Sequence, residues 1–212
     1  MSPEEKTVLE LEIRQTLDLP PRLLRLLSAV HEAGHAVVAQ TLGMWVWEVH
    51  VVSHERIGMG GDRCQIREDM DALPTVDYVA MLLAGAQASG LWFIGRGRDP
   101  RKDPDLTHRL NNLAGTDLEE VWARCQTLGM SKEEATPKVQ ATIRAANIIL
   151  QHRWIDVLGL AYAVARRGSL VGQELFPYLH RPAREVEARE AYRVWQEENA
   201  DLWPAEESRL KA

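Results

Sequence analysis

The chain has 212 residues, of which 45% are hydrophobic and 26% are charged. This composition is typical of one globular domain and excludes an intrinsically disordered chain, which would be poorer in apolar residues. The formal net charge of -6 disfavours a general nucleic-acid or anionic-membrane binder, because such proteins need an excess of Lys and Arg. We therefore expect one sizeable domain with no nucleic-acid partner and no membrane partner.

The N-terminus, the cysteines and one uncharged segment bear on cellular location. Residues 1–21 begin with acidic side chains and have no apolar core, so they do not resemble a signal peptide. Cys64 and Cys125 lie outside any CxxC or Cys/His cluster and are expected to be reduced thiols. Residues 78–95 reach the lower length limit of a membrane span, but their small residues favour a helix packed inside a protein core. The expected location is cytoplasmic.

The first predicted element is a helix over residues 21–42. A proline pair suits its first turn, and Gly43 suits its end. Next, β-branched and aromatic residues over 45–52, WVWEVHVV, predict a strand. A glycine-rich turn at 58–61 would allow residues 62–66 to return as a second strand. This hairpin is the clearest β signal in the chain.

The middle of the chain predicts two helices separated by a loop. Pro74 is expected to open the uncharged helix, and glycines and prolines predict a loop over residues 95–104. Thr116 and Glu119 have the spacing of a capping box, which predicts a helix from there to Gly129.

The last third of the chain also predicts helices. Pro137 is expected to start a long helix that Gly168 ends. From Pro182 the chain is dense in Glu and Arg, and Glu185 and Arg189 have the spacing of an ion pair across one helical turn. This segment predicts a solvated helix or an oligomer contact. The predicted fold class is mainly α, a compact helical domain with a small β-hairpin or sheet.

The sequence His-Glu-Ala-Gly-His at residues 31–35 carries the strongest chemical signal. On a helix, His31 and His35 lie on one face with their Cβ atoms about 5–6 Å apart, so both imidazoles can bind one metal ion. Glu32 stands where metalloproteases with this pattern have their general base. The motif therefore predicts a catalytic zinc site.

The alternative interpretation is a pair of core histidines whose nitrogens are satisfied by protein groups. Chance alone would produce about 0.02 such motifs in a chain of this composition, which favours the metal site. A catalytic zinc usually has three protein ligands, and the spacing of the residues does not identify the third. The candidates downstream are Asp103, Asp105, His108, Glu119, Glu120 and His152.

Five stretches, the first of which contains this motif, are distributed over most of the chain. They are AVHEAGHAVVA (29–39), AMLLAGAQASGLWFIG (80–95), DPDLTHRL (103–110), LGMS (128–131) and RGSLVGQEL (167–175). Together they resemble the peptidase domain of FtsH-type ATP-dependent zinc metalloproteases. The resemblance implies a helical metallopeptidase domain over residues 1–180, followed by a charged helical tail over residues 181–212.

The resemblance also implies roles for individual residues. It makes His31 and His35 zinc ligands, Glu32 the catalytic base and Asp105 the third ligand, because DPDL stands where the family has Asn-Asp-Leu before a helix. It further implies that an extended substrate lies beside the 45–52 hairpin, held by backbone pairing. The expected function is zinc-dependent endopeptidase activity on unfolded or flexible protein segments.

Two departures from the family narrow this expectation. Gln87 and Ser89 replace an Arg and a Glu of the family's helix, and no stretch matches the phosphate-binding pattern GxxxxGK[ST]. The family's membrane anchor is also expected to be missing. Substrates would then be flexible already, or an ATPase partner would deliver them. The alternatives are an inactive or regulatory module that acts by binding, and a protease that cuts one specific regulator. Homo-oligomerisation is left open.

Overall fold

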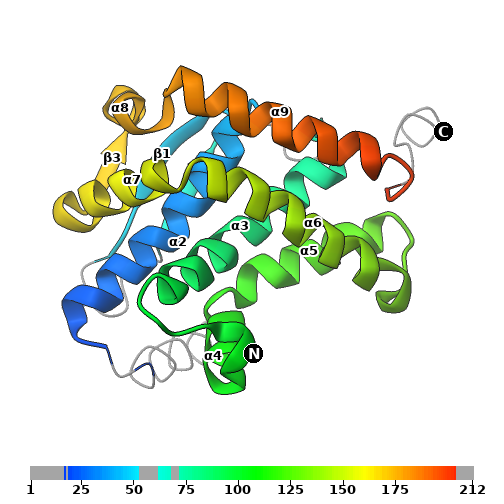
Figure 1. The fold of residues 1–212 in the computed structure, drawn as a ribbon, viewed down its shortest axis with the longest axis horizontal. Coiled ribbons are helices and arrows are strands. Elements are labelled where there is room, and N and C mark those ends of the chain that lie inside the picture. The colour runs from blue at the N-terminus through cyan, green and yellow to red at the C-terminus, as the bar shows by residue number, and fades with distance from the viewer. Residues whose placement is uncertain (1–16, 18, 53–61, 68–71, 204–212) are drawn as a thin grey trace.

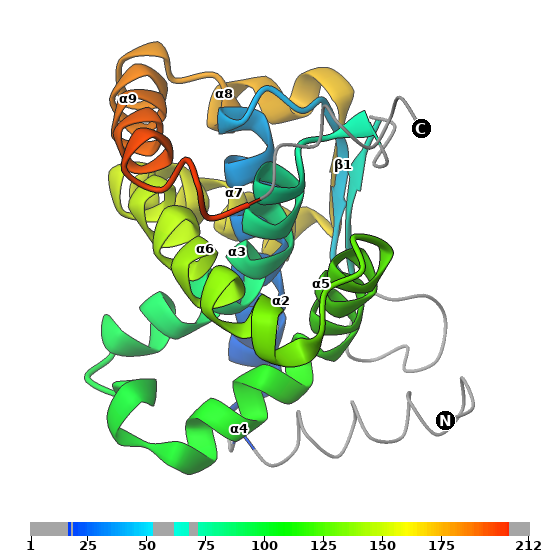
Figure 2. The same ribbon diagram turned by 90° about the vertical axis from the view of Figure 1, so that its right-hand side faces the viewer.

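The computed structural model describes residues 17, 19–52, 62–67 and 72–203 (Figure 1). It is mainly helical and has a small three-stranded antiparallel sheet, which confirms the predicted fold class. In Figure 2 the sheet lies on one side of the central helices, and α9 lies on the other side.

Two long helices, α2 (Pro21–Thr41) and α3 (Thr75–Ile94), pack against each other in the middle of the molecule (Figures 1 and 2). They approach closely because Gly34 has no side chain. A Cβ atom on Gly34 would lie 2.7 Å from the backbone oxygen of Ala84 and 2.7 Å from the Cβ of Ala88. The helix predicted over residues 21–42 is thus confirmed, and it forms the centre of the core.

The sheet has the strand order β2-β1-β3, with β1 (Val46–His50), β2 (Arg63–Ile66) and β3 (Ser169–Val171). Both pairings are antiparallel, which confirms the predicted hairpin of β1 and β2. Because β1 is central, the edges of the sheet belong to β2 and β3. The predicted turn at residues 58–61 lies outside the described residues.

The uncharged segment forms most of α3, which buries side chains along nearly its whole length, Trp92 and Phe93 among them. It is the core helix that its small residues predict. Among the helices that the structure describes, none has both the length and the apolar character required to cross a bilayer.

The loop predicted after α3 contains a short 3-10 turn, Pro100–Lys102, before α4 (Pro104–Leu113). α5 (Gly115–Thr127) follows almost without a break, with Ala114 at its N-cap. The helix predicted in this region is therefore present, but the capping box predicted at Thr116 is wrong. Thr116 lies inside the first turn, because the chain passes directly from α4 into α5.

The single helix predicted from Pro137 is in fact two helices, α6 (Lys132–His152) and α7 (Trp154–Arg167). α6 starts before Pro137 because Ser131 and Glu134 form a capping box. The Ser131 amide donates to the Glu134 carboxylate at 2.8 Å, and the Glu134 amide donates to the Ser131 hydroxyl at 3.2 Å. α7 ends, as predicted, at a glycine with a positive φ, Gly168.

The charged C-terminal segment forms α9 (Pro182–Glu198), and the predicted ion pair between Glu185 and Arg189 is present at 2.8 Å. The helix is not simply solvated, however. Its Tyr192 and Trp195 side chains are buried in the hydrophobic core, and α9 packs along α6. Within the described residues this helix therefore belongs to the same packed unit as the rest of the chain.

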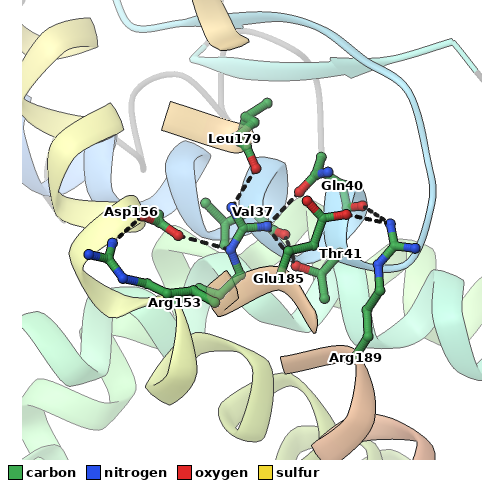
Figure 3. Close-up of polar contacts among 9 residues, drawn as sticks. Val37, Gln40, Thr41, Arg153, Asp156, Leu179, Glu185 and Arg189 are labelled. Atoms are coloured by element: carbon green, nitrogen blue, oxygen red, sulfur yellow. Dashed lines mark hydrogen bonds and ion pairs between the residues drawn. The ribbon is translucent and has the colours of Figure 1, made fainter. Parts of the chain in front are cut away.

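A fully buried arginine, Arg153, lies at the junction of α6 and α7 (Figure 3). Its guanidinium donates to the Asp156 carboxylate at 3.0 Å and to the Thr41 hydroxyl at 3.0 Å. It also donates to the Leu179 carbonyl, at the end of α8 (Phe176–Leu179). The side chain thus fixes the last turn of α2 to three later helices.

Candidate metal centre

His31 and His35 lie one turn apart on the same face of α2, as the motif predicts. Their ring centroids are 4.7 Å apart, and the rings are nearly perpendicular. His35 is buried and His31 is half-buried. Both side chains direct their Nε2 atoms to the same carboxylate, which belongs to a residue on another helix.

That carboxylate is Asp117, in the first turn of α5. Its Oδ2 atom lies 3.0 Å from His31 Nε2 and 3.4 Å from His35 Nε2. In a tetrahedral zinc site with ligands ~2.05 Å from the ion, neighbouring ligand atoms lie ~3.3 Å apart. One nitrogen from each histidine and one oxygen from Asp117 all lie within 4.8 Å of one another, so the three residues could hold a metal ion.

The far side of each imidazole is also contacted. The Nδ1 of His35 donates to the backbone carbonyl of Met81 at 2.8 Å, which leaves its Nε2 free to act as a ligand. The Nδ1 of His31 lies 3.5 Å from the hydroxyl of Ser89. Met81 and Ser89 both belong to α3, so this helix orients the two histidines. Ser89 therefore lies beside a candidate ligand, at a position where the chain departs from the family pattern.

A glycine of α3 leaves room at the convergence point. A Cβ atom on Gly85 would lie 2.4 Å from His35 Nε2 and 2.5 Å from His31 Nε2. Both distances are far below contact distance, so a side chain at this position would occupy the space that the two ligand nitrogens face. The donor set and the space beside it fit a small metal ion.

Glu32 lies next to the first histidine and is buried. Burial raises the pKa of its carboxyl above the usual range, although positive charge on His31 and His35 acts in the opposite direction. A carboxylate with a raised pKa is a stronger base than an exposed one, as general-base catalysis near neutral pH requires.

The histidine and aspartate that face each other have opposite pKa shifts. Burial by itself would lower the pKa of His35, but the Asp117 charge raises it to about 9. Burial would raise the pKa of Asp117, but the charges of His35 and His31 hold it well below its usual range. Without a metal, the group is therefore an ion pair, in which a proton takes the place of the cation.

The group opens into a pocket of about 140 Å³ that is lined by polar side chains and by four leucines. The polar lining residues are His31, Glu32, Asp62, Ser89, Thr116, Asp117 and Ser28, and the apolar ones are Leu17, Leu24, Leu27 and Leu113. A ligand in this pocket would reach the candidate metal ligands and the buried base together.

The structure does not bring Asp105, the predicted third ligand, to the two histidines. Asp105 is exposed in the first turn of α4, and among the described residues the group around the histidines contains Asp117 in its place. Both aspartates are followed by leucine and open a helix, so the Asn-Asp-Leu pattern can be aligned with either. The spacing of residues gave no reason to prefer Asp117, which was absent from the candidates.

The other candidates from the sequence also lie outside this group. Asp103 caps α4 by accepting from the Leu106 amide, and His108 contacts Asn112 on the exposed side of the same helix. Glu120 accepts from the Tyr78 hydroxyl, and His152 is exposed at the end of α6. Glu119 is exposed on α5.

The other residue that differs from the family's helix, Gln87, points to α6. Its side-chain oxygen accepts from the amide of Asn147 at 3.0 Å, so it links α3 to α6 by a neutral hydrogen bond. It is absent from the residues that line the pocket around the histidines. The presence of Gln87 in place of the family's charged residue therefore leaves the candidate ligands unaffected.

No family model and no curated protein matches this chain.

Proposed function

We propose that this protein is a zinc-dependent endopeptidase in which His31, His35 and Asp117 hold the zinc ion and Glu32 is the general base. Two observations carry the proposal: His31, His35 and Asp117 converge on one point, and His31, Asp117 and Glu32 line the same open pocket. Two imidazoles and a carboxylate are a ligand set found in catalytic zinc sites, which keep one further position open.

The proposed reaction needs a base and an electrophile at one place. When bound, zinc supplies Lewis acidity, which polarises the scissile carbonyl and lowers the pKa of a water. Glu32 accepts a proton as water attacks the carbonyl carbon, and it then donates that proton to the nitrogen of the leaving amine as the C–N bond breaks. Glu32 is thereby regenerated, and the products are a carboxylate and an amine.

The arrangement of the sheet supports a polypeptide substrate. The implied substrate position beside the hairpin needs an edge strand, and β1 has partners on both sides, so we assign this role to β2. Asp62, immediately before β2, lines the same pocket as Glu32. A peptide added along β2 would gain backbone hydrogen bonds that demand little of its sequence.

The proposed substrates are unfolded or flexible segments, because a strand can be added only if the substrate backbone is extended. Folded substrates would need an ATPase partner to deliver them. We further propose a cytoplasmic location, which the free thiols of Cys64 and Cys125 support.

The experiment compares the wild type with Glu32→Gln, Asp117→Asn and Asp105→Asn. Bound zinc is measured by elemental analysis, and activity is measured as cleavage of casein. We expect the wild type and Asp105→Asn to bind zinc and cut, Glu32→Gln to bind zinc without cutting, and Asp117→Asn to lose both. Zinc binding without cleavage by the wild type would favour a binding module or a protease specific for one partner. Absence of bound zinc in the wild type would refute the proposal.

A further inference from the structure

Two of the four leucines that line the pocket, Leu24 and Leu27, lie on the same face of α2 as His31. They define its apolar end, and His31 and Asp117 define its polar end. Leu27 precedes His31 by four positions and Leu24 precedes it by seven, so their positions lie about 6 and 10.5 Å from His31 along the helix axis. An extended peptide advances about 3.3 Å per residue. The side chain of a residue beside the scissile bond can therefore reach these leucines while the bond itself lies at the polar end.

Two further leucines line the pocket. Leu113, the last residue of α4, precedes Asp117 by four positions. Leu17 comes from the segment before α2 and is only 2% exposed. Leu17 therefore takes part in the wall of the pocket, although it lies 14 positions before His31 in the sequence.

The pocket is small for a site that holds both a peptide group and a side chain. Its volume of about 140 Å³ includes the polar end, and a cavity of about 150 Å³ holds one benzene molecule. Once a peptide group occupies the polar end, less than the volume of one benzene molecule remains, which favours an aliphatic side chain over a phenyl or indole ring.

We propose that the four leucines form the side-chain subsite beside the scissile bond, and that Leu17 limits its depth so that aliphatic side chains are selected over aromatic ones. The inference rests on the proposed peptidase function. Leu17 is a specificity-determining residue in this scheme, and it takes no part in the chemistry.

The test uses full-length Leu17→Ala with Leu19→Ala as the matched control. Leu19 is two positions away and packs on the core, but it does not line the pocket. A peptide series carries Val, Leu, Phe or Trp beside a single cleavable bond, and kcat/KM is measured for each. The wild type and Leu19→Ala should prefer Val and Leu. Leu17→Ala should raise the Phe-to-Leu ratio of kcat/KM tenfold or more, because truncation lengthens the subsite.

A second readout does not depend on turnover. The same peptides are titrated into Glu32→Gln and into Glu32→Gln combined with Leu17→Ala, and the ratio of dissociation constants for Phe and Leu peptides is compared. A shift in this ratio supports the subsite even if the wild type proves inactive, in which case only the proposed reaction fails. If folded Leu17→Ala changes neither the kcat/KM ratio in an active enzyme nor the binding ratio, the inference is overturned.

Discussion

Gly85 offers the sharpest test of the candidate metal centre, because adding one methyl group there affects both histidines together. In Gly85→Ala the new Cβ would lie 2.4 Å from His35 Nε2 and 2.5 Å from His31 Nε2, whereas ordinary contact begins near 3.4 Å. Each ring must therefore move by roughly 1 Å, the difference between 3.4 and 2.4 Å. Metal sites tolerate deviations of only about 0.2 Å in ligand distance.

The expected effects on zinc affinity and on stability differ in size. We expect the zinc affinity of Gly85→Ala to fall by at least about 100-fold, because both imidazoles leave their positions. Overpacking costs about 1–3 kcal/mol, but alanine favours a helix interior over glycine by about 1 kcal/mol. The free energy of unfolding of the metal-free variant should therefore fall by at most about 2 kcal/mol.

Zinc affinity is measured by competition with a chelating dye, and thermal unfolding is followed by circular dichroism in the presence of a chelator. Gly90→Ala, in the same helix, is the matched control. A Cβ atom on Gly90 would lie 3.9 Å from the Cγ atom of Pro100, which is an ordinary contact distance. This control should bind zinc like the wild type. If Gly85→Ala also bound zinc with wild-type affinity, the assignment of the metal position to the space between the histidines and α3 would be refuted.

Three further predictions concern charge and burial. In metal-free protein the pKa of His35 is raised to about 9 from 6.5, so its stabilising charge is fully present below pH 6.5 and is lost as the pH rises through 9. The free energy of unfolding should then fall by about 3 kcal/mol, measured by denaturant titration from about pH 6 to about pH 10; equal stability across this range would contradict the ion pair with Asp117. Replacing the buried Arg153 by methionine should lower the free energy of unfolding by about 3–5 kcal/mol and the Tm by at least ~6 °C, because several buried acceptors lose their donor; an unchanged Tm in thermal unfolding would refute this. Burial raises the pKa values of the Cys64 and Cys125 thiols, so both should react slowly with a disulfide reagent at about pH 8 in the native protein and rapidly in denaturant; fast reaction of the native protein would contradict it.

The helix that is interrupted between α6 and α7 shows where sequence patterns are insufficient. Pro137 suggested a helix start, but the capping box of Ser131 and Glu134 lies upstream and sets the actual start. The break at Arg153 has no local signal of the kind that Gly or Pro provides. It coincides with a buried hydrogen-bond network whose partners come from distant parts of the chain (Figure 3).

The sequence alone determined the helix that carries His31, Glu32 and His35, since helical periodicity and the relation of residues four apart are local properties. The sequence did not identify Asp117 as the third member of the group. Asp117 is 86 positions from His31 and meets it only because α3 packs against α2 and α5 packs against α3. Asp105 has the same local pattern but lies on an exposed face of α4. Local sequence sets which face a helix presents, but only the packing of helices decides which distant side chain meets that face.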